Sequence, residues 1–103
     1  MNYEIRLHPK AKTDLFGLDK GVQTSVLKQI VKLESAPELG ELLGNKNGIN
    51  LSGLRKLYAA KKQIRIIYEI VADEIVVHVI AIGKREEMEA YKEALKRIEK
   101  PVV

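Results

Sequence analysis

The sequence predicts an α+β fold, in which an N-terminal strand and a helical hairpin pack on a small antiparallel sheet and a C-terminal helix follows. Three observations support this prediction: a short alternating stretch at the N-terminus, apolar stripes at helical spacing, and three strand-like runs in the second half. The length of 103 residues suits one core, so we assign residues 1–103 to a single domain.

The first third of the chain is expected to form a strand and a helical hairpin. From Asn2 to Leu7 apolar and charged residues alternate, which is typical of a half-buried strand. Pro9 suits the first turn of a helix, and apolar residues continue at helical spacing up to a break near Gly21. A second apolar stripe ends before Pro37, because the residue before a proline disfavours the helical conformation.

The rest of the chain is expected to form a loop, three antiparallel strands and a final helix. Residues 38–50 are rich in Gly and Asn and are predicted to form a loop with one helical turn at 38–43. After Gly83, apolar residues recur at helical spacing, with acidic residues first and basic residues last, as suits a helix dipole. The strand candidates and the two-residue turns between them cover, in order, residues 52–59, 60–61, 63–71, 72–73 and 74–83.

These short turns would fix which side chains share a face of the sheet. With Ala60 and Lys61 as a turn, Lys56 lies directly opposite Arg65, and Tyr58 shares their face. Like charges placed opposite each other cost about 0.2–1 kcal/mol, so the two cations would serve another purpose. The neighbouring cation would also lower the pKa of Lys56. The opposite face should be the main core face, formed by Ile64, Ile66, Tyr68, Ile70, Ile75, Val77, Val79 and Ala81.

The second hairpin is predicted to place Arg65 opposite Ile80. We expect the C-terminal helix to cover part of this face and to bring Tyr91 to its rim. Arg85 follows the last strand directly and could join the two cations there. Apolar residues of the same face would otherwise be left exposed, namely Ile67, Val76, Ile80 and Ile82.

Composition narrows the classes of protein. The 18 Lys and Arg against 14 Asp and Glu give a net charge of +4, which favours a polyanionic partner only where the cations cluster. Without cysteine there are no disulfides and no thiolate metal sites, and we expect no metal or other cofactor. His8 and His78 lie far apart in the sequence and are interpreted as structural residues. No apolar run could span a bilayer and no signal peptide is visible, so we expect a cytoplasmic protein.

A set of basic and aromatic side chains suggests a site for RNA. Such a set binds phosphate, stacks bases and can cleave RNA without a metal. Cleavage requires that the 2′-hydroxyl lose a proton, that positive charge surround the phosphorane, and that the 5′-oxygen gain a proton. The same residues also fit structural roles as solvated strand cations, a junction cap and a core aromatic residue. The set comprises Lys56, Arg65, Arg85 and Tyr91.

Two segments resemble a known family, the RelE-type toxins. The sequence VIAIGKREEMEAYKEALKRI, residues 79–98, resembles the C-terminal segment of that family. The sequence LRKLYAAKKQIRIIYEI, residues 54–70, resembles the hairpin that precedes it, including an Arg-x-x-Tyr strand. The order of elements matches over essentially the whole chain. The resemblance therefore implies a RelE-like α+β fold without a metal.

The resemblance implies a toxin of a type II toxin–antitoxin pair that enters the ribosomal A site and cuts messenger RNA there by 2′-hydroxyl attack. By position, Lys56 matches a proton acceptor and Arg65 an arginine that stabilises phosphate charge. Arg85 matches a proton donor or phosphate clamp, and Tyr91 an aromatic residue that stacks on or orients the nucleotide. The residues expected to bind RNA are Tyr58, Lys61, Lys62 and Lys84.

The same resemblance implies the partners of the chain. These are a cognate antitoxin, the ribosome with its messenger RNA, and no membrane. We expect the antitoxin to compete for the Arg65 face or to bind next to it.

One position departs from the family pattern. Well-known members carry a second lysine two residues after the first, whereas this chain has Tyr58, which supplies no charge. Lys61 or Lys62 could supply that charge from the turn. Two alternatives stay open: a ParE-like toxin that inhibits DNA gyrase without catalysis, and an inactive member that only binds its antitoxin.

Overall fold

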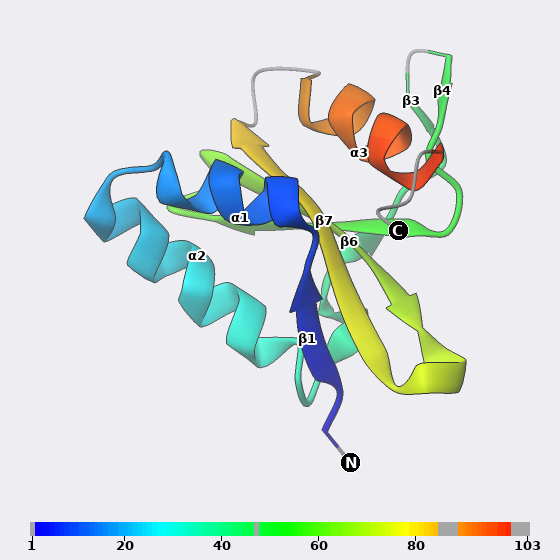
Figure 1. Ribbon diagram of the computed structural model, residues 1–103, viewed down its shortest axis with the longest axis horizontal. Coiled ribbons are helices and arrows are strands. Elements are labelled where there is room, and N and C mark those ends of the chain that lie inside the picture. Colours follow the sequence, from blue (N-terminus) through cyan, green and yellow to red (C-terminus); the bar gives the residue numbers. More distant parts are fainter. Residues whose placement is uncertain (1, 47, 85–88, 100–103) are drawn as a thin grey trace.

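A mixed sheet with helices on both faces forms the centre of the computed structural model, which describes residues 2–46, 48–84 and 89–99 (Figure 1). The elements are, in chain order, β1 (Glu4–Leu7), α1 (Pro9–Phe16), α2 (Lys20–Lys32), the 3-10 turn η1 (Pro37–Leu39), β2 (Glu41–Leu42), β3 (Asn45–Lys46), β4 (Ile49–Asn50), β5 (Leu54–Ala59), β6 (Ile64–Val71), the 3-10 turn η2 (Ala72–Glu74), β7 (Val76–Lys84) and α3 (Glu89–Glu99). The predicted α+β class and the expected helices and strands are confirmed.

The five-stranded sheet has the order β1-β7-β6-β5-β2. The predicted antiparallel arrangement of β5, β6 and β7 is confirmed, and β1 runs parallel to β7 along its outer edge. Both ends of the sheet are formed by short strands, while β3 and β4 make a separate hairpin near α3. Within the described residues no helix is both long enough and apolar enough to cross a bilayer.

The segment after α2 folds back onto the sheet instead of remaining a loop. The buried Tyr68 hydroxyl donates to the Pro37 carbonyl at 2.7 Å and accepts from the Gly40 N–H at 2.8 Å. A Cβ at Gly40 would lie 2.6 Å from that hydroxyl, so only glycine fits there. This anchor places β2 alongside β5, and the helical turn predicted at 38–43 is a 3-10 turn one residue earlier.

Both predicted two-residue turns are wrong. Ala59 pairs with Ile64, so four residues, 60–63, connect β5 and β6. Residues 60–62 have φ angles of 51°, 55° and 66°, a left-handed run without glycine. Two-residue hairpins need Asn-Gly or similar pairs, which this turn lacks.

The second connection is also longer than predicted. Val71 pairs with Val76 and not with Glu74, because η2 and a left-handed residue intervene. That residue is Ile75, with φ 55°.

β7 contains one extra residue. The extra residue is Ile80. Ala81 and Val79, on either side of it, pair with Ile67 and Tyr68, which are adjacent in β6, so Ile80 has no pair. Such a bulge inverts the alternation of side chains beyond it.

Because of this bulge, two residues of β7 lie on the opposite face from the one predicted, and the strand partner of Arg65 differs from the prediction. Ile82 packs with α1 and α2, although it was expected on the Arg65 face, and Ala81 packs on the α3 side, although it was expected in the main core. Gly83, not Ile80, lies opposite Arg65.

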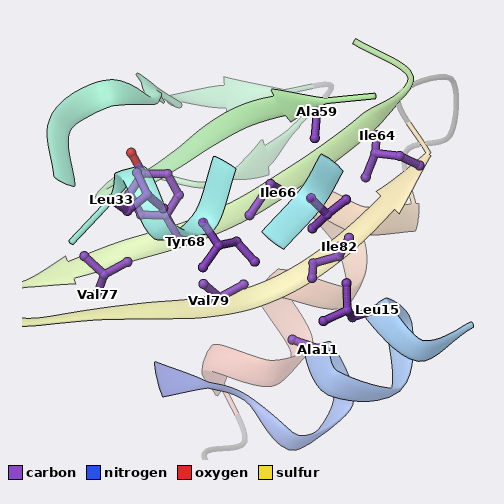
Figure 2. Packing of buried hydrophobic residues seen from close by; sticks show 12 residues of the cluster. Ala11, Leu15, Leu33, Ala59, Ile64, Ile66, Tyr68, Val77, Val79 and Ile82 are labelled. Atoms are coloured by element: carbon purple, nitrogen blue, oxygen red, sulfur yellow. The ribbon is translucent and has the colours of Figure 1, made fainter. Parts of the chain in front are cut away.

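Two hydrophobic clusters lie on opposite faces of the sheet. The larger one joins α1 and α2 to the sheet, and Figure 2 shows Ala11 and Leu15 of α1 directed toward Val79 and Ile82 of β7. The smaller one lies under α3 and consists of Leu43, Leu51, Leu54, Ile67, Ile80, Ala81, Ala90, Tyr91 and Ala94, with Ile49 at its edge. The expectation that the C-terminal helix covers the Arg65 face is confirmed.

Candidate active site

The β5–β6 hairpin brings Lys56, Tyr58 and Arg65 together on the α3 side of the sheet. Tyr58 is the direct strand partner of Arg65, while Lys56 pairs with Ile67. The predicted opposition of Lys56 and Arg65 is therefore wrong by two residues along the strand, because the connecting turn is longer than expected. A shift of two residues along a strand keeps the same face, so the three side chains still share it.

Arg65 is covered by an aromatic ring from α3. Its guanidinium carbon lies 4.3 Å from the centre of the Tyr91 ring. Arg65 is 8% exposed and Tyr91 is 3% exposed, so the cation and the ring face each other out of contact with bulk water. Tyr91 is thus a core residue that also contacts a candidate site residue, so the two roles that the sequence offered do not exclude each other.

A glycine allows α3 to approach this closely. Gly83 lies across from Arg65, and a Cβ there would be 3.0 Å from the Cβ of Ala90. Any larger residue would push the start of α3 away from the sheet. The bulge at Ile80 is what puts this glycine under the helix.

Lys56 donates a hydrogen bond from Nζ to the Tyr58 hydroxyl oxygen at 3.0 Å and lies 3.6 Å from Glu41 Oε2. The hydrogen bond to Tyr58 raises the pKa of Lys56, and Glu41 acts in the same direction. The expected lowering of this pKa is therefore wrong, because Lys56 faces Tyr58 and not Arg65. At neutral pH Lys56 is an ammonium group that can stabilise negative charge.

The pKa of Tyr58 is shifted in the opposite direction from that of Lys56. The hydrogen bond from Lys56 lowers the pKa of the Tyr58 phenol, and Arg65 lowers it further, against partial burial, which raises it. The phenol therefore sits between two cations that favour its ionised form.

Lysines line a cleft next to these residues. The cleft has a volume of about 640 Å³ and lies between α2 and the β5–β6 hairpin. Tyr58 and Lys56 form part of its wall, and among the described residues that line it Glu41 is the single acidic one. Such a surface attracts a polyanion by long-range charge as well as by contact. The lysines that line it are Lys28, Lys32, Lys56, Lys61 and Lys62.

Of the predicted site residues, Lys56, Tyr58, Lys61 and Lys62 line this cleft. Arg65, the strand partner of Tyr58, and Tyr91, which covers Arg65, are not among its lining residues. Lys84 lies on the α2 side of the sheet, in a separate hollow that it shares with Asp19 and Lys62. Arg85 lies outside the described residues. The structure thus brings together Lys56, Tyr58, Arg65 and Tyr91, with Lys61 and Lys62 on the turn beside them.

Sequence reasoning missed a clamp that holds α3 in place. Arg97 donates from Nη1 to the Ile80 carbonyl at 2.7 Å and to Asp14 Oδ2 at 2.8 Å. The same Asp14 oxygen accepts the Ile82 N–H at 3.1 Å. In the sequence, Arg97 is one of the basic residues at the end of the predicted C-terminal helix, and its i, i+4 spacing from Glu93, which lies 3.3 Å away, is a local sign of a partner. No pattern in the sequence around Asp14 points to these contacts, because its partner Ile82 is turned to this face by the bulge at Ile80.

The two histidines lie closer together than their sequence separation suggests. Their ring centres are 6.2 Å apart, and His78 Nδ1 is 3.6 Å from Glu69 Oε1. His8 accepts the Lys10 N–H at 3.1 Å and so begins α1. Throughout the described part of the chain, no group of acidic and histidine residues could hold a metal ion.

Comparisons with known proteins agree with this geometry. The family described as "ParE toxin of type II toxin-antitoxin system, parDE" matches residues 5–89. The mRNA interferase toxin RelE of Escherichia coli K12 is 31% identical over 101 residues, covering 95% of this chain and 99% of that one.

Solved structures show the same fold. A mutant of the E. coli toxin RelE in the free state has a TM-score of 0.76 and 26% identity, covering 95% of this chain and 99% of that chain. The same mutant toxin in complex with a peptide of the antitoxin RelB has a TM-score of 0.69 and 25% identity, covering 100% of both chains.

The fold and the matches define the class of this protein as a small α+β toxin of the type II toxin–antitoxin kind. Within that class, the chain belongs to the RelE/ParE toxin superfamily, and its resemblance to RelE-type toxins is confirmed.

Proposed function

We propose that this protein is a ribosome-dependent endoribonuclease that cuts messenger RNA in the A site. The observation that carries the proposal is the buried Arg65–Tyr91 pair, which sits beside Lys56 and Tyr58 at the edge of a lysine-lined cleft. The relatedness to an mRNA interferase supports the same activity.

The side chains match the steps of RNA cleavage by the 2′-hydroxyl. Arg65 offers a planar cation to the phosphate, whose negative charge grows in the transition state. Lys56, which keeps its proton, adds a second positive charge. Arg85 would protonate the leaving 5′-oxygen or clamp the phosphate, as the resemblance implies. No step needs a metal.

Binding would begin at the cleft. Lys61 and Lys62 would hold the RNA backbone, and Tyr58, which lines the cleft wall, would contact the nucleotide. Lys84 lines a separate hollow and not this cleft, so we assign it a more distant backbone contact.

Access to Arg65 is the step that the ribosome would control. Because Tyr91 covers the guanidinium, a phosphate can reach it only after the ring moves aside. A message held by the ribosome would supply the binding energy for that movement, whereas free RNA would not. We therefore expect little cleavage of naked RNA.

We also propose that a cognate antitoxin binds on or next to the α3 side of the sheet, in the cytoplasm where ribosomes work. The complex of E. coli RelE with a RelB peptide supports an antitoxin partner. Hydrogen exchange over residues 65–98, compared with and without antitoxin, tests the location. Unchanged protection there would contradict it.

A second candidate function is inhibition of DNA gyrase, because the matching family is described as the ParE toxin. Cleavage of a messenger programmed on ribosomes, together with a gyrase supercoiling assay, separates the two. We expect cut messages and uninhibited gyrase. Intact messages with inhibited gyrase would support the ParE-like alternative, and loss of both activities would indicate a member that only binds antitoxin.

Arg85 and Tyr91 provide the sharpest variants for the cleavage assay. Arg85→Ala should lower the rate about a hundredfold or more, because a charge contact in the transition state is lost, while the melting temperature barely moves. Tyr91→Phe should keep much of the activity. Arg6→Ala, on β1 beside His78 of β7, is the matched control and should leave cleavage unchanged. Equal losses of stability and activity in Arg85→Ala would end its catalytic assignment.

A further inference from the structure

We propose that the Tyr58 phenolate accepts the proton of the attacking 2′-hydroxyl, an inference that rests on the proposed function and identifies its general base. The position of Tyr58 supports this role. Its hydroxyl oxygen accepts a hydrogen bond from Lys56 Nζ at 3.0 Å, and the residue is the direct strand partner of Arg65. Tyr58 is only partly buried and lines the cleft, so a ribose bound there would lie next to it.

The other groups at the site are poorly suited to accept a proton. Arg65 is permanently charged, and Lys56 holds its proton because of the hydrogen bond to Tyr58. Glu41 is the remaining anionic group of the cleft, but its side chain is 72% exposed and lies on the far side of Lys56. An exposed carboxylate is also a much weaker base than a phenolate.

The charges around Tyr58 favour the phenolate. Lys56 and Arg65 both lower the pKa of the phenol, and only partial burial opposes them. Among the described residues, Lys56 on β5 and Arg65 on β6 interact directly with the phenol. Glu41 of β2 lies next to Lys56, and Tyr91 of α3 covers Arg65. The other titratable groups around the same cleft are Lys28 and Lys32 of α2 and Lys61 and Lys62 of the β5–β6 turn. All but Glu41 and Tyr91 are cations.

The step balances as follows. The phenolate oxygen takes the 2′-hydroxyl proton while the 2′-oxygen forms its bond to phosphorus. The bond between phosphorus and the 5′-oxygen breaks, and that oxygen takes a proton from a water molecule, which leaves a hydroxide ion to accept the proton of the Tyr58 phenol. The products are a 2′,3′-cyclic phosphate and a 5′-hydroxyl.

The test measures cleavage of ribosome-bound message as a function of pH. For the wild type, the rate should rise with pH up to an apparent pKa below the ordinary tyrosine value of about 10. Tyr58→Phe keeps the ring and loses the base, so its rate should fall a hundredfold or more and this rising limb should vanish. Tyr58→His, which restores a base, should recover cleavage with a limb near pH 6.5.

Three controls separate this role from a structural one. Tyr3→Phe removes a phenol on the α1–α2 side and should leave rate and pH profile unchanged. Glu41→Gln should leave the rising limb present, whereas loss of the limb in this variant would assign the base to Glu41. All variants should keep the wild-type melting temperature.

A titration without RNA distinguishes the failure of this inference from the failure of the proposed function. The tyrosinate absorbance of the wild type minus that of Tyr58→Phe isolates the Tyr58 phenol, whose pKa should be lowered, and Lys56→Met should raise it. Cleavage by Tyr58→Phe at the wild-type rate and pH profile would overturn the inference alone. A wild-type chain that cuts no ribosome-bound message would overturn both.

Discussion

On the α1–α2 side of the sheet the buried cluster is built from hydrophobic residues, whereas on the α3 side Arg65 and Arg97 are buried beside a smaller apolar cluster. Burial of a charge costs free energy unless partners offset it. Tyr91 covers one arginine, and Asp14 with the Ile80 carbonyl pairs with the other. The first face is therefore organised for stability, and the second holds cations that stability alone would not favour.

The largest expected change is a loss of unfolding free energy on substitution of a core residue on the α1–α2 side. Ile66 is 0% exposed there, so Ile66→Ala should lower the free energy of unfolding by about 4 kcal/mol, from lost burial and the cavity left behind. Urea unfolding measures this loss. Cleavage per folded molecule should not change. A loss of activity per folded molecule would contradict the idea that the α1–α2 face is organised for stability alone. Leu27→Ala, on the exposed surface of α2, is the control and should cost about 0.5 kcal/mol or less.

The next largest effect is a slower cleavage rate on substitution of Arg65. Arg65→Lys keeps the charge but loses the planar group that contacts phosphate, so cleavage should slow about a hundredfold, or about 3 kcal/mol of barrier. The free energy of unfolding should fall by less than about 1 kcal/mol, as measured by urea titration. Arg55→Lys changes the arginine that donates to the Gly40 carbonyl at 2.8 Å, outside the site. Similar loss of cleavage in both variants would show that Arg65 has no special role.

A smaller effect is expected from the α3 clamp. Arg97→Met removes hydrogen bonds to Asp14 and to the Ile80 carbonyl, which should cost about 2 kcal/mol of unfolding free energy. Amide exchange in α3 should speed up more than exchange in β6. Lys96→Met, at a neighbouring position with a 72% exposed side chain, is the control. Uniform acceleration across the sheet would mean that the clamp supports the whole fold and not α3 alone.

The smallest effect is a pH dependence at His8. Burial lowers the pKa of His8, and Arg97 and His78 add to the lowering. Below the ordinary value of about 6.5 the unfolded chain binds the proton more readily, so stability present above that pH is lost as the pH falls through the folded pKa. His8→Asn can still begin α1 but cannot titrate, so it should flatten the curve of unfolding free energy between pH 7.5 and pH 5. An unchanged slope would remove His8 from the explanation.

Periodicity was sufficient to predict the helices and the three long strands, because these signals are local. Register depended on turns that lack the usual residues. Ala60, Lys61 and Lys62 adopt left-handed backbone without glycine, and Ile75 does so after η2. The bulge at Ile80 has no local signal, yet it decides that Gly83 and not Ile80 faces Arg65.

The sequence predicted which residues of the candidate site share a face better than it predicted which of them are in contact. Lys56, Tyr58 and Arg65 share a face because alternation within each strand survives a register error of two residues. The pKa direction of Lys56 was wrong because it depended on the exact partner. The Arg97–Asp14 contact joins residues 83 positions apart, and no pattern within either helix could announce it.

The outer side of β5 also bears on how the protein behaves at high concentration. β2 pairs only with Arg55 and Lys56, so the last three residues of β5 form an open border of the sheet. Gln29 donates to the Tyr58 carbonyl at 2.7 Å and so occupies the acceptor that a second copy would seek. The lysines around this border repel another copy as well, so the surface suited to RNA also keeps the purified toxin from joining sheets edge to edge.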